Sequence, residues 1–230
     1  MQLEAGKTYA VLTGDVVGST RLKGQERVDL LEIMRETSVL LQEQFPLDVP
    51  LPLEIYRGDS WQVLVQNPEN ALKVGLYFRA HIRMGMKDHP VDTRFSIGLG
   101  AIDLLPEDHV SSGDGEAFWL SGHGLERMPR NRRMVILLSA SYADCQSDGA
   151  DTILFLVDTL ASRWTRKQAE AVVGALAGKT QESIAQSWAE NPITQQAVAQ
   201  HLDRAGWNAV EHGISYFERW LAMPKQLLLK

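Results

Sequence analysis

The stretch Tyr-Ala-Val-Leu-Thr-Gly-Asp-Val-Val-Gly-Ser-Thr occupies residues 9–20 and joins a strand pattern to a loop pattern. Its first part, Tyr9–Thr13, is a short apolar run of the kind that forms a buried strand. Gly14 and Asp15 end that run, and a turn with a central glycine follows at 16–20. Backbone N–H groups in such a turn can bind a phosphate, so we expect a carboxylate and an anion-binding loop at the end of the first strand.

Outward from this stretch, the spacing of apolar residues alternates between helix and strand periods. The expected elements are a helix over 25–45, strands over 53–56 and 61–65 joined by a hairpin turn at 57–60, a helix over 69–84 and a strand over 93–100. This βαββαβ order predicts an α/β (α+β) domain with a ferredoxin-like sheet and helices on one face. In that topology the first and third strands are antiparallel neighbours, which brings Asp15 and Asp59 to one edge of the sheet.

The second half of the chain is expected to extend this sheet and then to form a separate module. A helix should end near Met128, a further apolar strand should span 134–138, and 153–157 is a candidate for a last strand. We therefore predict two domains, an α/β domain over residues 1–158 and a small all-α domain over 159–230.

Asp15 and Asp59 suit a divalent-metal site. Two carboxylates held close together repel each other unless one takes up a proton or a cation lies between them. Mg²⁺ in particular binds through one or two carboxylates together with phosphate oxygens and water. The alternative is structural, because Asp is also common in turns that bind no ligand. On the residues alone, both interpretations stay open.

Four segments resemble the motifs of class III nucleotidyl cyclases, namely Gly14–Thr20, Arg57–Trp61, Ser96–Gly100 and Gly122–Met128. The resemblance implies that Asp15 and Asp59 bind the metal and that the loop after the first strand binds phosphates. It also implies a catalytic role for Arg127, which stands where the family has an Arg that stabilises the transition state. Two positions depart from the family. The Asn of the same helix is His123 here, and the purine-selecting residue is Ile55, whose side chain cannot hydrogen-bond to a base.

The chain as a whole resembles the SatD family more closely, through Gly14–Leu22, Trp164–Gln168 and Ala205–Glu211. This resemblance implies a cyclase-like domain followed by a C-terminal helix-turn-helix. The expected ligands of Mg²⁺ or Mn²⁺ are Asp15, Asp59 and the backbone carbonyl of Val16, and the expected phosphate contacts are Val17, Gly18, Ser19 and Thr20. The catalytic candidates are Arg127 and His123. In the cyclase-like family two chains complete each other's sites, so we expect a homodimer in which Arg127 faces the partner's Asp15.

Three short helices are expected in the C-terminal module. The first spans Thr165–Ala177 and stops at Gly178, the second runs from a Thr180 cap through Ala189, and the third runs from a Thr194 cap over 195–205. This arrangement is typical of a helix-turn-helix, whose second element enters the major groove of DNA. The expected DNA contacts are Thr194, Gln195, Gln196, Gln200, His201 and Arg204. The alternative is a helical bundle that contacts protein, which the long turn before the third helix and the nearby acidic residues favour.

Charge and composition limit the partners of the protein. From Ala161 onward the chain has eight Lys and Arg against six Asp and Glu, a net charge of +2, whereas the preceding part carries −8. The asymmetry indicates different partners for the two halves, although a net charge of +2 attracts DNA only weakly. Cys145 is the only cysteine, which excludes an internal disulfide and a cysteine-based zinc site. No apolar run reaches the roughly 18 residues of a membrane span, and residues 1–8 lack a signal-peptide pattern, so we expect a cytoplasmic protein without membrane contact.

The sequence therefore predicts a regulatory protein that binds a nucleotide or another phosphorylated small molecule with Mg²⁺ or Mn²⁺ and that contacts DNA. Two alternatives stay open. One is a nucleotidyl cyclase or nucleotidyltransferase that uses two metal ions, against which Ile55 argues. The other is an adaptor protein with a vestigial site, against which the retained Asp15 and Asp59 argue.

Overall fold

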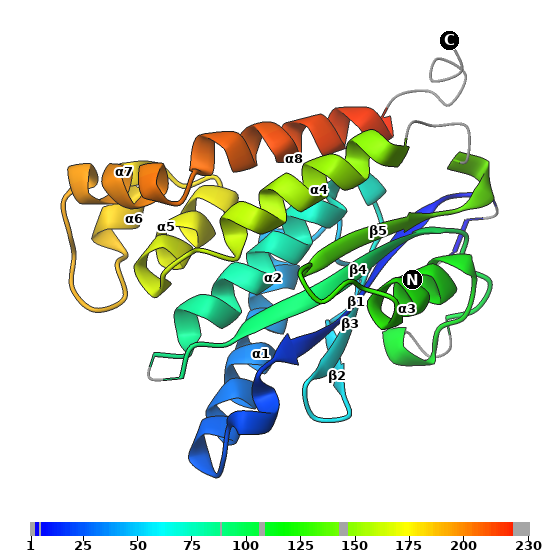
Figure 1. Ribbon diagram of the computed structural model, residues 1–230, viewed down its shortest axis with the longest axis horizontal. Coiled ribbons are helices and arrows are strands. Elements are labelled where there is room, and N and C mark those ends of the chain that lie inside the picture. The colour runs from blue at the N-terminus through cyan, green and yellow to red at the C-terminus, as the bar shows by residue number, and fades with distance from the viewer. Residues whose placement is uncertain (1–2, 5, 88, 106–108, 143–146, 223–230) are drawn as a thin grey trace.

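The fold is built around a five-stranded mixed sheet, seen in a computed structural model that describes residues 3–4, 6–87, 89–105, 109–142 and 147–222. The strands are β1 (Tyr9–Val17), β2 (Glu54–Tyr56), β3 (Ser60–Val65), β4 (Asp92–Gly100) and β5 (Met134–Leu138). Their order across the sheet is β2-β3-β1-β4-β5 (Figure 1). β1 runs antiparallel to both β3 and β4, and β5 runs parallel to β4. The predicted antiparallel pairing of the first and third strands is confirmed.

Eight α-helices accompany the sheet in the described part of the chain. They are α1 (Gln25–Gln44), α2 (Ala71–Gly85), α3 (Glu116–Glu126), α4 (Ser147–Ala161), α5 (Arg166–Leu176), α6 (Gln181–Gln186), α7 (Gln195–Arg204) and α8 (Trp207–Ala222). None of these helices combines the length and the apolar character that crossing a bilayer requires.

Helices cover both faces of the sheet. On one face Trp61 of β3 packs against Phe78 of α2, with ring centroids 4.5 Å apart, and α1 packs beside α2. On the other face α3 lies across β1, and Ser121 Oγ is 2.7 Å from Thr13 Oγ1. Successive residues of a strand point to opposite faces, so the side chain of Asp15 lies on the same face as that of Thr13. The end of β1 therefore presents its carboxylate on the face that α3 covers.

Close contact between α3 and β4 sets the direction of that helix. A Cβ on Gly98 would lie only 2.2 Å from the carbonyl oxygen of Ala117, and a Cβ on Gly124 only 2.1 Å from Ser96 Oγ. Both glycines are thus needed for α3 to pack this closely against β4. Because Gly98 meets the first turn of α3 and Ser96 meets its last turn, the C-terminal end of α3 lies toward the end of the sheet where β1 stops.

The predicted strand over residues 153–157 is wrong, because this segment belongs to α4. Leu154, Val157 and Ala161 are buried, and their spacing of three and four residues is that of one helix face. Phe155 is 41% exposed, as a residue on the flank of that face would be. A short apolar run fits a strand or a buried helix equally well, and only the spacing beyond the run distinguishes them.

The starts of α5, α6 and α7 agree with the sequence, because a threonine caps each helix. Thr165 forms a capping box with Gln168, and the side chains of Thr180 and Thr194 each accept a hydrogen bond from the backbone N–H three residues later. An N-cap of this kind stabilises a helix by about 1 kcal/mol, so three caps in one short module fix its helix boundaries.

Two features of the C-terminal helices differ from the sequence expectation. α6 ends at Gln186 instead of near Ala189, because the backbone N–H of Ala189 donates to Glu170 Oε1 of α5 at 2.6 Å and the chain turns away. Helix α8, which was not expected from the sequence, lies alongside α4 (Figure 1). Its buried residues Val210, Ile214 and Phe217 have the helical spacing that could have revealed it.

The largest hydrophobic cluster extends from the sheet into the C-terminal helices. It includes Leu12 of β1, Phe78 of α2, Val172 of α5 and Phe217 of α8, all of them fully buried. α5 packs against α2 within this cluster. The predicted boundary between residues 158 and 159 falls inside α4.

A buried ion network crosses the same region. Arg79 of α2 is fully buried, and its guanidinium donates to both carboxylate oxygens of Asp92 and to Asp158 Oδ1, at 2.7–2.8 Å. Asp158 Oδ2 accepts the backbone N–H of Arg133, just before β5, at 2.6 Å. The network therefore ties α2, β4 and α4 to the segment that enters β5.

Candidate functional site

A pocket of about 320 Å³ opens at the edge of the sheet where β1 ends. It is lined by Asp15, Val16, Val17, Gly18, Ser19, Thr20, Asp59, Arg94, Arg130 and Arg133. The two aspartates and residues 16–20 were expected here from the sequence, although Val16 and Val17 belong to β1 and the loop begins only at Gly18. The three arginines were not expected. The pocket thus combines two carboxylates, a glycine-containing loop and three guanidinium groups.

The pairing of β1 with β3 brings the two aspartates into this pocket. Asp15 is the register partner of Ser60, the first residue of β3, and Asp59 directly precedes it. The backbone N–H of Val16 donates to the carbonyl oxygen of Asp59 at 3.2 Å, which closes the hairpin onto the end of β1. In that hairpin Arg57 has a φ of 51°, a left-handed conformation that is uncommon for a residue with a side chain.

The loop after β1 is shaped by Gly18, which has a φ of 89°. A short 3-10 turn, Ser19–Arg21, follows at once, and a Cβ on Gly18 would lie 3.1 Å from Arg21 Nη2. The hydroxyl of Ser19 donates to Asp59 Oδ2 and joins the loop to the hairpin. The loop is therefore held in place by a carboxylate and has a guanidinium beside its glycine.

Arg94 binds Asp15 through both ends of its guanidinium group. Arg94 is the register partner of Asp15 on β4, and its Nε and Nη2 donate to Asp15 Oδ1 and Oδ2, each at 2.8 Å. The hydrogen bonds from Arg94 to Asp15 raise the pKa of the guanidinium further above its usual range. Both carboxylate oxygens of Asp15 consequently have a cationic partner inside the chain.

Arg130 and Arg133 enter the pocket from the segment between α3 and β5. The carbonyl oxygen of Arg133 accepts the backbone N–H of Phe95 at 2.8 Å, which anchors the segment to β4. Arg133 Nη1 in turn donates to the carbonyl oxygen of Arg130 at 3.1 Å. With Arg94 these side chains give three cationic groups against two aspartates, in a chain whose net charge is −6. Such a local excess of positive charge favours an anionic ligand.

The residues of the pocket fit a divalent cation only in company with an anion. Among the described residues, no three His, Cys, Asp or Glu side chains are grouped in a way that could hold a metal ion. Two carboxylates with phosphate oxygens and water are nevertheless a common Mg²⁺ environment. Asp15 and Asp59 can supply the two carboxylates of such an environment, provided that Arg94 and the Ser19 hydroxyl release them.

The two catalytic candidates of α3 lie outside this pocket. His123 is half-buried and contacts the ring of Trp119, with ring centroids 4.8 Å apart. Arg127 is exposed at the C-terminal cap of α3. Neither residue lines the pocket of its own chain. Trp119 is 67% exposed, which is unusual for so large an apolar side chain.

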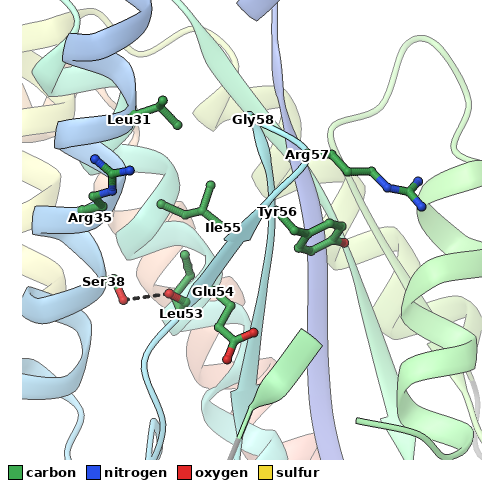
Figure 2. A pocket seen from close by; sticks show the side chains of 9 residues that line it. All are labelled: Leu31, Arg35, Ser38, Leu53, Glu54, Ile55, Tyr56, Arg57 and Gly58. Carbon is green, nitrogen blue, oxygen red and sulfur yellow. Dashed lines mark hydrogen bonds between the residues drawn. The ribbon is translucent and has the colours of Figure 1, made fainter. Parts of the chain in front are cut away.

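A larger cavity of about 470 Å³ lies between α1 and β2, at the outer edge of the sheet. Figure 2 shows Ile55 on the α1 side of β2, together with Leu31 and Arg35, whereas Tyr56 and Arg57 point to the other side of the strand. This cavity and the Asp15 pocket have no lining residue in common. Ile55 is therefore an apolar residue that faces a cavity separate from the Asp15 pocket.

The sequence-predicted DNA contacts lie on α7 and its cap. Thr194, Gln195, Gln196, Gln200 and Arg204 are exposed, and Val198 and Leu202 are buried on the inner side. Three of the candidates are engaged within the chain. The side chain of Thr194 caps α7, Gln195 Nε2 donates to Gln181 Oε1 at 3.0 Å, and the ring of His201 stacks on that of Trp188. Burial, with the positive charges of Lys167 and Arg204, lowers the pKa of His201.

Sequence reasoning missed the three arginines of the Asp15 pocket. Arg130 and Arg133 belong to the segment Arg130–Arg133, in which three of the four residues are arginine, and this cluster is conspicuous in the acidic part of the chain. Arg94 gives no comparable signal, because its role depends on the register between β1 and β4. That register is fixed by long-range packing and cannot be obtained from the local pattern.

Comparison with known proteins places these observations in context. The sequence model of the SatD family matches residues 9–206. A solved structure described as the crystal structure of the guanylyl cyclase Cya2 is 15% identical, with 59% of this chain and 76% of that chain covered and a TM-score of 0.39. No curated protein matches the chain.

Proposed function

The chain belongs to the SatD family, and from the geometry of the Asp15 pocket we propose that it is a regulatory protein that binds a phosphorylated small molecule together with a divalent cation. A nucleotide is the first ligand to test. The observation that carries the proposal is the presence of residues 16–20, Asp15, Asp59 and three arginines in one pocket, where residues 16–20 form the end of β1 and the loop that follows it. Backbone N–H groups and guanidinium groups are the usual partners of phosphate oxygens in proteins.

The roles of the individual groups follow from their positions. The loop around Gly18 and the 3-10 turn after it would contact one phosphate group, and Arg130 and Arg133 would contact a second. Asp15 and Asp59 would hold Mg²⁺ or Mn²⁺, with the backbone carbonyl of Val16 as a further ligand. The cation supplies positive charge that neutralises the phosphate oxygens when it is bound. The size of the pocket, about 320 Å³, suits the phosphate part of a nucleotide better than a whole one.

A binding function accounts for the site better than catalysis does. Nucleotidyl transfer requires a preorganised positive group where charge develops in the transition state. Arg127, the residue that the cyclase resemblance gives this role, is exposed at the end of α3 and does not line the pocket of its own chain. Catalysis would thus depend on a second chain, whereas the pocket of one chain already holds groups that can bind an anion.

DNA is the proposed second partner, through α7. The exposed face of this helix carries Gln196, Gln200 and Arg204, which are residue types that pair with adenine and guanine in the major groove. Lys167 and Arg204 lie close enough to His201 to help lower its pKa, so two cationic side chains lie beside this face. A regulator of this kind would bind the phosphorylated ligand with its sheet domain and DNA with its C-terminal helices.

A thermal-shift screen tests the ligand-binding proposal. Pyrophosphate, ATP, GTP and their monophosphates are added to the full chain with and without Mg²⁺. A ligand at 100 times its Kd should stabilise the native state by about 2.7 kcal/mol, which corresponds to about 5–10 °C for a chain of this size. With Mg²⁺ present, the shift should shrink in Asp15→Asn and Asp59→Asn and persist in Asp29→Asn, an exposed aspartate of α1. No shift with any of these anions, with or without the metal, would overturn the proposal.

A further inference from the structure

Asp15 and Asp59 both have a partner within the chain. Asp15 is neutralised by Arg94 through two hydrogen bonds of 2.8 Å, and Asp59 accepts the hydroxyl of Ser19. A divalent cation that binds these carboxylates has to displace groups that already satisfy them. The pocket therefore differs from a metal site whose two carboxylates have no hydrogen-bond partners within the protein.

We propose that Arg94 is an internal counterion that makes metal binding conditional on the anionic ligand. It neutralises Asp15 until a phosphorylated ligand arrives, then transfers its hydrogen bonds to phosphate oxygens, and so releases Asp15 to the divalent cation. This inference rests on the proposed function of the pocket and adds an order of binding. The cation binds together with the phosphorylated ligand and not alone.

The strand register makes the exchange geometrically simple. Asp15 and Arg94 are cross-strand neighbours on β1 and β4, so the guanidinium reaches the carboxylate from the adjacent strand without leaving the pocket wall. The side chain of Arg94 is 36% exposed and that of Asp15 is 24% exposed. Both side chains are thus held at the surface of the pocket and accessible to a ligand, instead of being fixed in the core as Arg79 is.

Charge explains why the metal and the ligand should be coupled. A divalent cation at Asp15 would lie next to a guanidinium that occupies both carboxylate oxygens, with Arg130 and Arg133 in the same pocket. Like charges at this distance repel, so the cation alone is disfavoured. A di- or triphosphate brings several negative charges, which pair with the arginines and leave the carboxylates for the metal. The chemical class that fits this exchange is a ligand with two or more linked phosphate groups.

Calorimetry and Mn²⁺ electron paramagnetic resonance on the full chain test this order. Mn²⁺ is titrated alone and in the presence of pyrophosphate, and pyrophosphate is titrated with and without Mn²⁺. The parent protein should bind Mn²⁺ about tenfold more tightly or better with pyrophosphate present, a factor within the range of coupled sites. Arg94→Gln should bind Mn²⁺ alone about tenfold more tightly than the parent does, and should bind pyrophosphate more weakly. Arg35→Gln, which removes an exposed arginine of α1 outside the pocket, should behave like the parent.

A second variant tests the same ion pair in case Arg94→Gln does not fold. Asp15→Asn leaves Arg94 without its counterion, so metal-free pyrophosphate should bind several-fold more tightly than in the parent while the effect of Mn²⁺ is lost. If the parent binds Mn²⁺ and pyrophosphate independently, or if Arg94→Gln folds but gains no affinity for Mn²⁺, the counterion role is wrong and the proposed function survives. If the parent binds neither pyrophosphate nor its Mn²⁺ complex, the proposed function itself fails.

Discussion

Arg79 of α2 and Asp158 of α4 form a buried ion pair in which Arg79 Nη1 lies 2.7 Å from Asp158 Oδ1. The same guanidinium binds Asp92 of β4, and Asp158 also accepts the backbone N–H of Arg133, which lines the Asp15 pocket. Asp92 is adjacent to Thr93, whose hydroxyl donates to the carbonyl oxygen of Asp15 at 2.7 Å. The ion pair therefore joins the C-terminal helices to the strand ends that form the pocket.

Replacement of Arg79 by Met should strongly destabilise the native state. The substitution leaves Asp92 and Asp158 buried without their cation, and breaking a buried ion pair in this way typically costs about 3–5 kcal/mol. Urea unfolding measures the loss as a lower midpoint with an unchanged slope. Arg35→Met, at an exposed position of α1, serves as the control. A loss below about 1 kcal/mol in Arg79→Met would mean that the buried carboxylates find other partners.

Stability should fall as the pH falls from about 6.5 to about 4, because of His81. Burial, with a smaller effect from Lys179, lowers the pKa of His81 from 6.5 to about 4 in the folded chain. Between pH 6.5 and the lowered pKa, His81 is protonated in the unfolded chain but not in the folded chain. The free energy of unfolding therefore decreases as the pH falls, until the pKa of the folded chain is reached. The full effect is about 3 kcal/mol at most. His81→Gln should flatten the curve in this range when unfolding by urea is repeated at each pH.

The exposed His212 of α8 provides the matched control for that experiment. His212→Gln should keep the pH dependence of the parent, because the substitution removes a histidine from the surface and not from the core. An unchanged pH dependence in His81→Gln would show that groups other than His81 are responsible in this range. Burial alone would raise the pKa of Asp92, but Arg79 and Arg83 more than offset it and hold it below its usual range. The contribution of Asp92 is thus lost only at still lower pH.

Much of the sheet domain follows from local sequence, and the charge pattern of the pocket does not. Strand β1 and the β2–β3 hairpin are visible as apolar runs that end at Gly and Asp, which is enough to place Asp15 near Asp59. The partner of Asp15 is invisible at that level, because Arg94 is matched to it only by the register of β4 against β1. Register depends on which faces are buried in the whole fold.

The errors among the helices have a related origin. Residues 153–157 satisfy a strand pattern over five positions, and the helical spacing of α4 emerges only when Ala161 is included. The early end of α6 depends on Glu170, a residue of a different helix that accepts the backbone N–H of Ala189. Local periodicity describes a segment correctly only where no tertiary contact competes with it.

The protein is predicted to form a homodimer in which Arg127 of one chain completes the pocket of the other. Light scattering should then give twice the chain mass over a wide concentration range, and a monomer at every concentration would contradict the prediction. A mixing experiment adds a sharper test. Asp15→Asn and Arg127→Ala should each impair binding of the ligand together with Mn²⁺ when tested alone, but an equal mixture should recover about a quarter of the sites, since half of the dimers then carry one intact site.

Binding of DNA by α7 should require a defined sequence. The C-terminal part of the chain has a net charge of only +2, so it neutralises few phosphates and non-specific binding should be weak. Selection from a random pool at moderate salt should nevertheless enrich a motif. Gln196→Ala and Arg204→Ala should each weaken binding to that motif by about 1–3 kcal/mol, whereas Asn208→Ala, on the exposed side of α8, should not. Failure to enrich any sequence would favour contact with protein instead.

The central claim is that Asp15 and Asp59 act together, with the loop over 16–20, to bind a phosphorylated ligand and a divalent cation. Calorimetry with Mn²⁺ and the best nucleotide of the thermal-shift screen measures this most directly. We expect Mn²⁺ to strengthen nucleotide binding in the parent protein, and this effect of Mn²⁺ to be lost in both Asp15→Asn and Asp59→Asn while Asp29→Asn retains it. An undiminished effect of Mn²⁺ on nucleotide affinity in either Asp15→Asn or Asp59→Asn would contradict the shared site.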